Sequence, residues 1–172
     1  INKNIIDLLC SNKYNRDIKI QYITNILTSE FNANDLELKG DPVTFIGSTF
    51  MKYGESTPYY NHCIVLGGCT PIDNVDLECY NTEKELLCAW KDLVKRENPD
   101  IIIGYNIFGF DYEFMFQRAI QNKCQEEFLE LSREKGEICA NIKNGKIESI
   151  ENTKIAIASG EYDLKYINML GR

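Results

Sequence analysis

A short apolar run in the middle of the chain most constrains its fold. Residues 100–105 read Asp-Ile-Ile-Ile-Gly-Tyr and come directly after Asn98-Pro99. An unbroken run of this length is typical of a strand that is covered on both faces. Helices must then pack on the two sides of the sheet, so we expect an α/β architecture.

The segment before this run has the pattern of an amphipathic helix. Thr82 and Glu85 match a capping box, and Asn98-Pro99 ends the helix. Five apolar residues fall on one helical face: Leu86, Leu87, Trp90, Leu93 and Val94. Trp90 is therefore expected in the core and not as a platform for stacking a base.

Three strand-like segments precede that helix, at residues 43–50, 62–66 and 75–80. Turn residues separate them, among them Gly67-Gly68. We expect these strands to form an antiparallel meander and, with the run at 100–105, a mixed sheet.

A second helix is expected from about Asp111. Its inner side should carry Phe110, Phe114, Met115 and Ala119.

The remaining segments have weaker patterns. Residues 124–153 indicate a helix and an exposed hairpin that turns at Asn144-Gly145. Residues 154–158 alternate like a strand, and 162–170 are expected to pair back onto it. Residues 1–40 read as a helix followed by a polar loop, with a turn-rich boundary at 32–35.

Composition narrows the class of protein. The chain has 172 residues, 44% hydrophobic and 26% charged, which suits a folded domain. The net charge of −7 argues against a freestanding nucleic-acid binder, because such proteins carry a basic footprint. A negative net charge is still compatible with an enzyme that binds nucleic acid through metal ions. We expect no membrane span and no signal peptide, and the missing initiator Met indicates a start within a longer protein.

Cysteine usage indicates a reducing, intracellular compartment. The seven cysteines have no Cys-x-x-Cys spacing, and the single histidine is His62. Their odd number and their scatter through apolar positions favour free, mostly buried thiols over disulfides or a zinc site. They stand at positions 10, 63, 69, 79, 88, 124 and 139.

The residues around Asp111 are the candidates for chemistry. The expected strand runs out at Tyr105-Asn106, and Asp111 follows at the first turn of the next helix. Open α/β sheets place ligands beyond the carboxyl ends of their strands. A helix N-terminus favours an ionised carboxylate, whose oxygens can hold a hard cation. Two simpler readings stay open: Asp111 as a helix-capping residue, and Asn106 as a turn residue bonded to the backbone.

The pattern Tyr-Asn-x-x-x-Phe-Asp at 105–111 resembles the Exo II motif of family B DNA polymerases, most closely of the delta type. Two earlier segments resemble the same family in the same order: Asp-Pro-Val-Thr-Phe-Ile-Gly at 41–47, and Tyr-x-x-Glu-x-x-Leu-Leu-x-x-Trp at 80–90. The likeness is close over 41–119 and weak over 1–40, where an insertion suggests polymerases of large DNA viruses. It is moderate over 154–172, through Ser-Gly-Glu-Tyr at 159–162 and Met-Leu-Gly-Arg at 169–172.

The resemblance implies a fold and a domain plan. The fold would be an RNase H-like mixed sheet flanked by helices, the DnaQ-like 3′–5′ exonuclease fold, here incomplete. Residues 41–172 would be part of the exonuclease domain, with Exo II at 105–111. Residues 1–40 would be an N-terminal helical and loop insertion region.

The resemblance also implies an activity and a site. The family removes mismatched DNA 3′ ends with two Mg²⁺ or Mn²⁺ ions, one activating water and one stabilising the leaving oxygen. Asp111 would be a catalytic metal ligand, and Tyr105, Asn106 and Phe110 would contact the substrate strand. Partners would be single-stranded 3′ ends, primer-template DNA and the palm, fingers and thumb domains of the parent. The location would be the nucleus or a viral replication site.

The chain also departs from the family. An Asp-x-Glu strand is expected before Asp41, and a Tyr-x-x-x-Asp helix beyond Arg172, and neither is seen in the sequence. We therefore expect a fragment that is inactive alone. The pairs Asp35/Glu37 and Asp76/Glu78 have the right spacing, but we interpret them as ordinary solvated carboxylates.

Two other functions remain open. One is a catalytically dead, nuclease-like scaffold or partner-binding domain. The other is a stand-alone exonuclease of the same fold, which the polymerase-like flanks disfavour.

Overall fold

The structure is a computed structural model that describes residues 5–30 and 40–169. It divides into two compact units, Ile1–Gly40 and Asp41–Arg172. The first unit contains the helices α1 (Ile5–Cys10) and α2 (Arg16–Glu30). The side chain of Asn15 accepts the backbone N–H of Ile18 at 2.9 Å, which caps the start of α2. The expected boundary at 32–35 lies outside the described residues.

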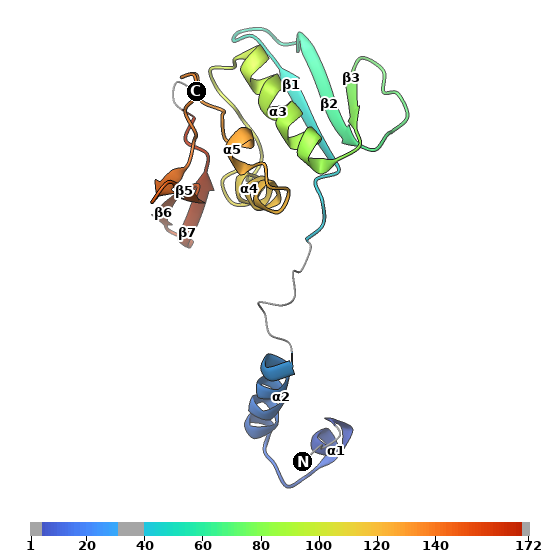
Figure 1. Cartoon of the computed structure of the whole chain (residues 1–172), viewed down its shortest axis with the longest axis vertical. Coiled ribbons are helices and arrows are strands. Elements are labelled where there is room, and N and C mark those ends of the chain that lie inside the picture. The colour runs from blue at the N-terminus through green and yellow to red at the C-terminus, as the bar shows by residue number, and fades with distance from the viewer. Residues whose placement is uncertain (1–4, 31–39, 170–172) are drawn as a thin grey trace. The chain divides into compact units, whose positions relative to one another are not determined.

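The second unit combines helices with three small sheets, so the mixed α/β organisation is confirmed (Figure 1). Its elements are β1 (Phe45–Phe50), β2 (Tyr60–Leu66), β3 (Asp76–Tyr80), α3 (Glu83–Glu97), α4 (Asp111–Gln121), α5 (Gln125–Phe128), β4 (Asn141–Lys143), β5 (Lys146–Ser149), β6 (Glu151–Ile157) and β7 (Gly160–Tyr166).

The first sheet has the order β1-β2-β3 and is not the expected antiparallel meander. β1 and β2 are antiparallel, but β3 runs parallel to β2, with His62 opposite Asp76 and Leu66 opposite Tyr80. The connection between β2 and β3 reverses the direction of the chain twice. Gly67 adopts a φ of 82° at the first reversal, and a turn closed by the Val75 N–H to the Ile72 carbonyl makes the second. Turn residues in the sequence signalled one reversal and did not reveal the second.

Helix α3 forms as predicted and packs across one face of this sheet (Figure 1). The capping box is present: Thr82 Oγ1 accepts the Glu85 N–H, and the Glu85 side chain accepts the Thr82 N–H. The helix ends at Asn98, which adopts the left-handed conformation, before Pro99. All five residues of the predicted stripe are buried. The Trp90 ring lies 6.1 Å from that of Phe128, so Trp90 is confirmed as a core residue.

A buried ion pair joins α3 to α4. Glu83, the first residue of α3, is 7% exposed, and both of its oxygens accept hydrogen bonds from the Arg118 guanidinium. Glu83 also accepts the backbone N–H of Val43 at 2.7 Å and Nδ2 of Asn122 at 2.7 Å. One carboxylate therefore connects the approach to β1, the start of α3 and the end of α4.

The apolar run at 100–105 is not the buried strand that the sequence predicts. Its backbone belongs to no sheet among the described residues, and Ile101 and Ile103 are 72% and 89% exposed. Only Ile102 packs against the core. A strand needs a neighbour to satisfy its backbone, and no neighbouring strand lies beside this run in the described part of the chain.

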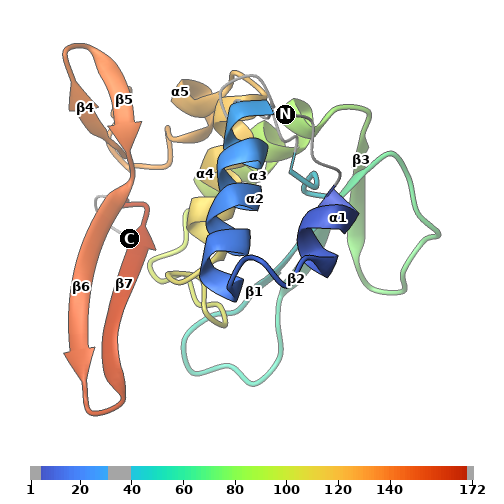
Figure 2. The same ribbon diagram turned by 90° about the horizontal axis from the view of Figure 1, so that it is seen from below.

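Two hairpins follow α5, and Figure 2 shows them on the same side of the second unit as α4 and α5. β4 and β5 turn at Asn144-Gly145, as predicted, with φ values of 52° and 73°. β6 and β7 pair from Glu151 opposite Tyr166 to Ile157 opposite Gly160. The predicted pairing is therefore confirmed, with both strands starting earlier than expected.

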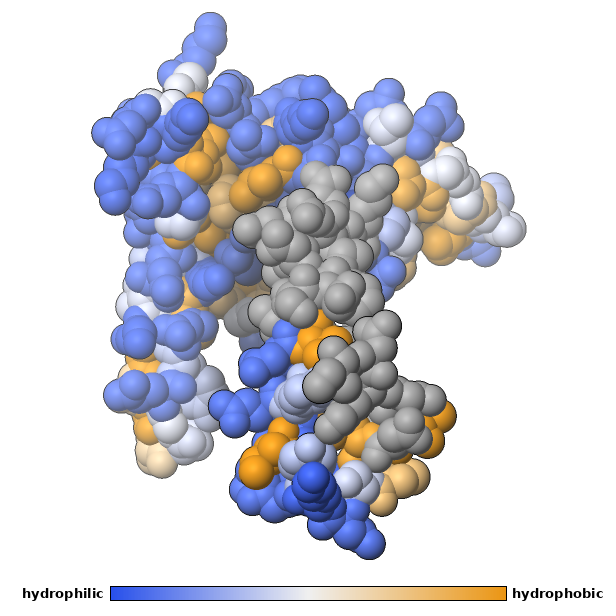
Figure 3. Space-filling view, turned by 60° about the horizontal axis from the view of Figure 1, so that its bottom comes forward, coloured by the Kyte–Doolittle hydropathy of each residue, from blue (hydrophilic) through white to orange (hydrophobic). Residues whose placement is uncertain are grey.

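The coloured part of the face in Figure 3 is largely hydrophilic, with apolar residues between the polar ones. All seven cysteines are free, but only Cys88, Cys124 and Cys139 are buried, so the expectation of mostly buried thiols is wrong. Cys10 in α1, Cys69 after β2 and Cys79 in β3 are exposed, and Cys63 in β2 is half-buried. Within the described residues, no helix is both long and apolar enough to cross a bilayer.

We expect Arg118→Met to destabilise the chain by about 3–5 kcal/mol, because it leaves the Glu83 charge buried without its cation. The free energy of unfolding in urea measures this. Lys84→Gln is the matched control, since Lys84 pairs with Glu127 at the surface and its loss should change stability by less than about 0.5 kcal/mol. Equal losses of unfolding free energy in the two variants would show that the Glu83–Arg118 pair matters no more than a surface pair.

The same pair predicts a pH dependence. Burial raises the pKa of Glu83, but hydrogen bonds from Arg118, Val43 and Asn122 outweigh it, and the net pKa lies below the ordinary 4.5. Because the folded-state pKa is depressed, the contribution is complete above pH 4.5 and is lost as the pH falls through the folded-state value. Urea unfolding between pH 7 and 2.5 should show this loss in the wild type and a smaller loss in Glu83→Gln.

Candidate functional site

An open cleft of about 740 Å³ lies between β1 and residues 99–107. One wall is the edge strand β1 with the preceding Pro42 and Val43, and the other is the apolar run. Trp90 of α3 and Met115 of α4 also line the cleft. The two walls expose apolar side chains, since Phe45 is 68% exposed and Ile103 is 89% exposed.

Asp111 stands in this cleft at the first position of α4, as predicted. It is half-buried. The N-terminus of α4 favours its negative charge, and no side chain caps this helix start. Burial raises the pKa of the neighbouring Tyr112, and the charge of Asp111 raises it further. Asp111 therefore places a carboxylate oxygen among the apolar residues that line the cleft.

Aromatic side chains line the same cleft as Asp111. Tyr105 is 99% exposed and lines the cleft together with Phe110. Phe110 is 57% exposed and stacks on Phe114, with ring centroids 5.3 Å apart. The prediction that Phe110 lies on the inner side of the helix is wrong, because Phe110 precedes the first helical turn and its ring extends over Phe114. Met115 and Ala119, in contrast, are buried as predicted.

Asn106 is the one predicted site residue that does not line the cleft. It adopts a left-handed conformation with φ 54°, and its carbonyl accepts the N–H groups of Gly109 and Phe110. A Cβ added at Gly109 would lie 2.3 Å from Asn106 Oδ1, so the amide side chain sits directly over this glycine. The structure thus shows a turn residue, and any substrate contact by Asn106 is a proposal.

The segment that leads to this turn is fixed at its beginning. The Arg133 side chain donates to the carbonyls of Asn98 and Pro99, each at 3.2 Å, and to Asp100 Oδ1 at 2.5 Å. At the other end of the turn, the Phe108 carbonyl accepts the N–H of Lys165 on β7 at 2.8 Å. The segment from Asn98 to the turn at 106–110 is therefore tied to two distant parts of the chain.

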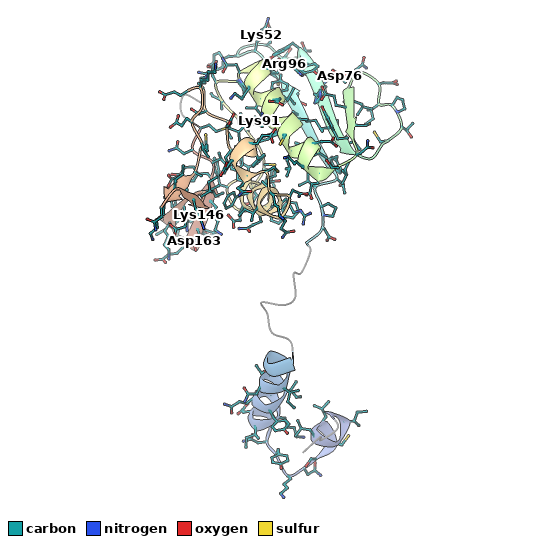
Figure 4. All side chains as sticks on the ribbon, in the orientation of Figure 1. Lys52, Asp76, Lys91, Arg96, Lys146 and Asp163 are labelled. Atoms are coloured by element: carbon teal, nitrogen blue, oxygen red, sulfur yellow. The ribbon has the colours of Figure 1, made fainter. Side chains whose placement is uncertain are left out.

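The pair Asp76/Glu78 is engaged elsewhere, on β3. Asp76 accepts the Tyr60 hydroxyl at 2.8 Å, and Glu78 accepts the Tyr80 hydroxyl at 2.8 Å. Burial and the bond to Asp76 raise the pKa of Tyr60 to about 12. Figure 4 shows Asp76 on β3 and Arg96 on the neighbouring α3, and Arg96 donates to the Tyr60 hydroxyl at 3.3 Å. Asp35/Glu37 lies outside the described residues.

A divalent cation fits this site only in part. Asp111 offers a hard carboxylate oxygen at the open side of a helix N-terminus, which suits Mg²⁺. Among the described residues, however, no three His, Cys, Asp or Glu side chains gather closely enough to hold a metal ion. The residues in hand therefore supply one ligand, and a complete site needs carboxylates from elsewhere.

Comparison with known proteins identifies the family. Residues 20–167 match the model of the DNA polymerase family B exonuclease domain. The chain belongs to this family. The turn at 106–110, the cleft and Asp111 all lie inside the matched region.

Individual relatives agree with this assignment. The DNA polymerase of Phaeocystis pouchetii virus is 39% identical over 98% of this chain and 17% of its own length. The DNA polymerase delta catalytic subunit of Arabidopsis thaliana is 35% identical over 79% of this chain and 12% of its own length. The DNA polymerase of Acanthamoeba polyphaga mimivirus is 29% identical over 87% of this chain. The exonuclease-domain chain thus spans less than a fifth of the curated relatives it matches here.

Sequence reasoning missed several residues that shape the site. Glu83 was part of the family-like segment at 80–90 but had no assigned role, and Arg118 was not singled out. Gly104 and Gly109 could have been recognised from the sequence, because glycines that flank a tight turn often let a side chain approach the backbone closely. A Cβ at Gly104 would lie 2.2 Å from Cγ2 of Ile107.

We expect Gly104→Ala to destabilise the chain by about 1–3 kcal/mol, because the β-branched, half-buried Ile107 has few alternative rotamers. Gly109→Ala should cost less than about 1 kcal/mol, since the exposed Asn106 side chain can rotate away. Urea unfolding gives both values. The side-chain amide resonances of Asn106 should move in Gly109→Ala, and the reverse order of stabilities would refute this view of the turn.

Proposed function

We propose that this chain is part of the metal-dependent 3′–5′ proofreading exonuclease of a DNA-directed DNA polymerase. The observation that carries the proposal is the position of Asp111, at the start of α4 and at the wall of an open cleft, in a chain of the exonuclease-domain family. In this role Asp111 binds Mg²⁺ or Mn²⁺ through its carboxylate. When bound, such ions activate water and stabilise the leaving oxygen of the scissile phosphate.

The cleft suggests where the missing carboxylates belong. β1 is an edge strand, and the run at 100–105 has no strand beside it among the described residues. We propose that the parent polymerase's Asp-x-Glu strand lies between them. It would complete an RNase H-like sheet, cover Ile101, Ile103 and Phe45, and place two carboxylates near Asp111. An inserted strand also satisfies the backbone groups on both sides of the cleft.

The aromatic residues beside Asp111 suit a single-stranded DNA 3′ end. Tyr105 and Phe110 are exposed at the cleft, and exposed aromatic faces stack on bases without reading sequence. Asn106 is proposed to contact the same strand with its amide. Unpaired 3′ ends are what a proofreading site receives, so a sequence-independent platform fits the substrate.

The proposed partners follow from this role. They are the DNA primer end and the palm, fingers and thumb domains of the parent, whose basic surface would offset the net charge of −7. The relatives' names include viral DNA polymerases and delta catalytic subunits. We therefore propose action in the nucleus or at a viral replication site.

In the polymerase that carries this chain, we expect Asp111→Ala to lower exonuclease activity on a single-stranded oligonucleotide by about 10²- to 10³-fold. Polymerase activity on a matched primer should stay unchanged. Asp163→Ala is the control, because Asp163 stands on β7 (Figure 4). Its ion pair with Lys154, at 4.0 Å, is exposed. Full exonuclease activity in Asp111→Ala would refute the assignment.

The isolated chain of 172 residues should be inactive, because its described residues supply a single cleft carboxylate. Incubation of the purified chain with a labelled oligonucleotide and Mg²⁺ checks this. Chelator-sensitive release of nucleotides that Asp111→Ala abolishes would show that the chain needs no further strand. A parent polymerase with no exonuclease activity would instead favour the scaffold function.

A further inference from the structure

The buried carboxylate of Glu83 contacts two segments that contribute to the candidate site. Its Oε1 accepts the Val43 N–H and Nε of Arg118, each at 2.7 Å. Its Oε2 accepts Nη2 of Arg118 and Nδ2 of Asn122. Val43 begins the β1 wall of the cleft, and Arg118 and Asn122 belong to α4 and its C-cap. The same side chain thus fixes one end of β1 and one end of α4.

The α4 residues in this cluster share a helix face with Asp111. Asp111, Met115, Arg118 and Asn122 follow one another at spacings of four, three and four residues, which places them along one stripe. Arg118 lies two turns beyond Asp111, about 10.5 Å along the axis. Met115, between them, is 8% exposed and lines the cleft. Arg118 therefore fixes the rotation of α4 about its axis and its position along that axis. Because the helix is rigid, both determine where Asp111 lies.

The other end of α4 is anchored mainly to β7, because Glu113 pairs with Lys165 at 3.1 Å and Tyr112 is buried. No side chain caps the helix at Phe110, and residues 103–106 are exposed. The turn at 106–110 is held by its own backbone hydrogen bonds and by the Lys165 N–H to the Phe108 carbonyl. The contacts of Arg118 in the body of α4 add to these anchors in setting how Asp111 is placed in the cleft.

We propose that Glu83 and Arg118 are positioning residues for Asp111 in the exonuclease reaction. This inference rests on the proposed function. The planar fork of Arg118 donates Nε to one oxygen and Nη2 to the other, which fixes the orientation of the two helices as well as their distance. A lysine keeps the charge but loses the fork. Arg118→Lys should therefore shift Asp111 while the fold stays intact.

The test uses the complete polymerase with Arg118→Lys and Glu83→Gln. We expect the Mg²⁺ concentration for half-maximal exonuclease activity to rise about 10-fold, as for other residues that orient a metal ligand. Independently of activity, amide hydrogen exchange across residues 111–116 should become faster, because the first turns of α4 are then held less rigidly. Polymerase activity on a matched primer should stay at the wild-type level. Lys84→Gln, beside Glu83 in an exposed pair, should change neither measurement.

The outcomes separate this inference from the proposed function. If Asp111→Asn abolishes exonuclease activity but Arg118→Lys and Glu83→Gln keep the wild-type Mg²⁺ requirement and exchange rates, the positioning role is wrong and the proposed function stands. Reduced activity with an unchanged Mg²⁺ requirement and unchanged exchange means fewer folded molecules, which also overturns it. If the wild type has no exonuclease activity that Asp111→Asn removes, both fail.

Discussion

The bond between Glu83 and Arg118 is the contact on which the second unit depends. Burial makes both charges expensive, so the pair is stable only when every donor and acceptor around it is satisfied. Here the Val43 amide and Asn122 complete the set. Three segments meet at this carboxylate, and each of them forms part of the cleft or leads into it. The geometry of the cleft is therefore a property of the packed core.

Local signals in the sequence predicted local structure well. Thr82 and Glu85 formed their capping box, and Asn144-Gly145 formed its turn, because both patterns depend on residues at most three positions apart. The stripe on α3 predicted the core for the same reason. Asp111 was also placed correctly at the start of α4. These features need no knowledge of what packs against them.

Features that depend on distant partners were predicted poorly. An apolar run of the composition of 100–105 requires a neighbour to become a buried strand, and Ile103 stays exposed where the described residues provide none. The direction of β3 depends on how residues 67–75 fold back, which two short turns decide. Phe110 looked like a core residue by spacing but precedes the helix that was meant to bury it. Arg118 gave no sign of its partner 35 residues away.

That separation also sets an order of events during synthesis. Glu83 leaves the ribosome 35 residues before Arg118 and 39 before Asn122, an interval of about 2–8 seconds at ordinary translation rates. α3 can form early through its own cap, but its first carboxylate must stay hydrated until α4 has been made. The nascent second unit therefore cannot close around Glu83 before Asn122 emerges, and a ribosome pause between these residues would prolong an open intermediate.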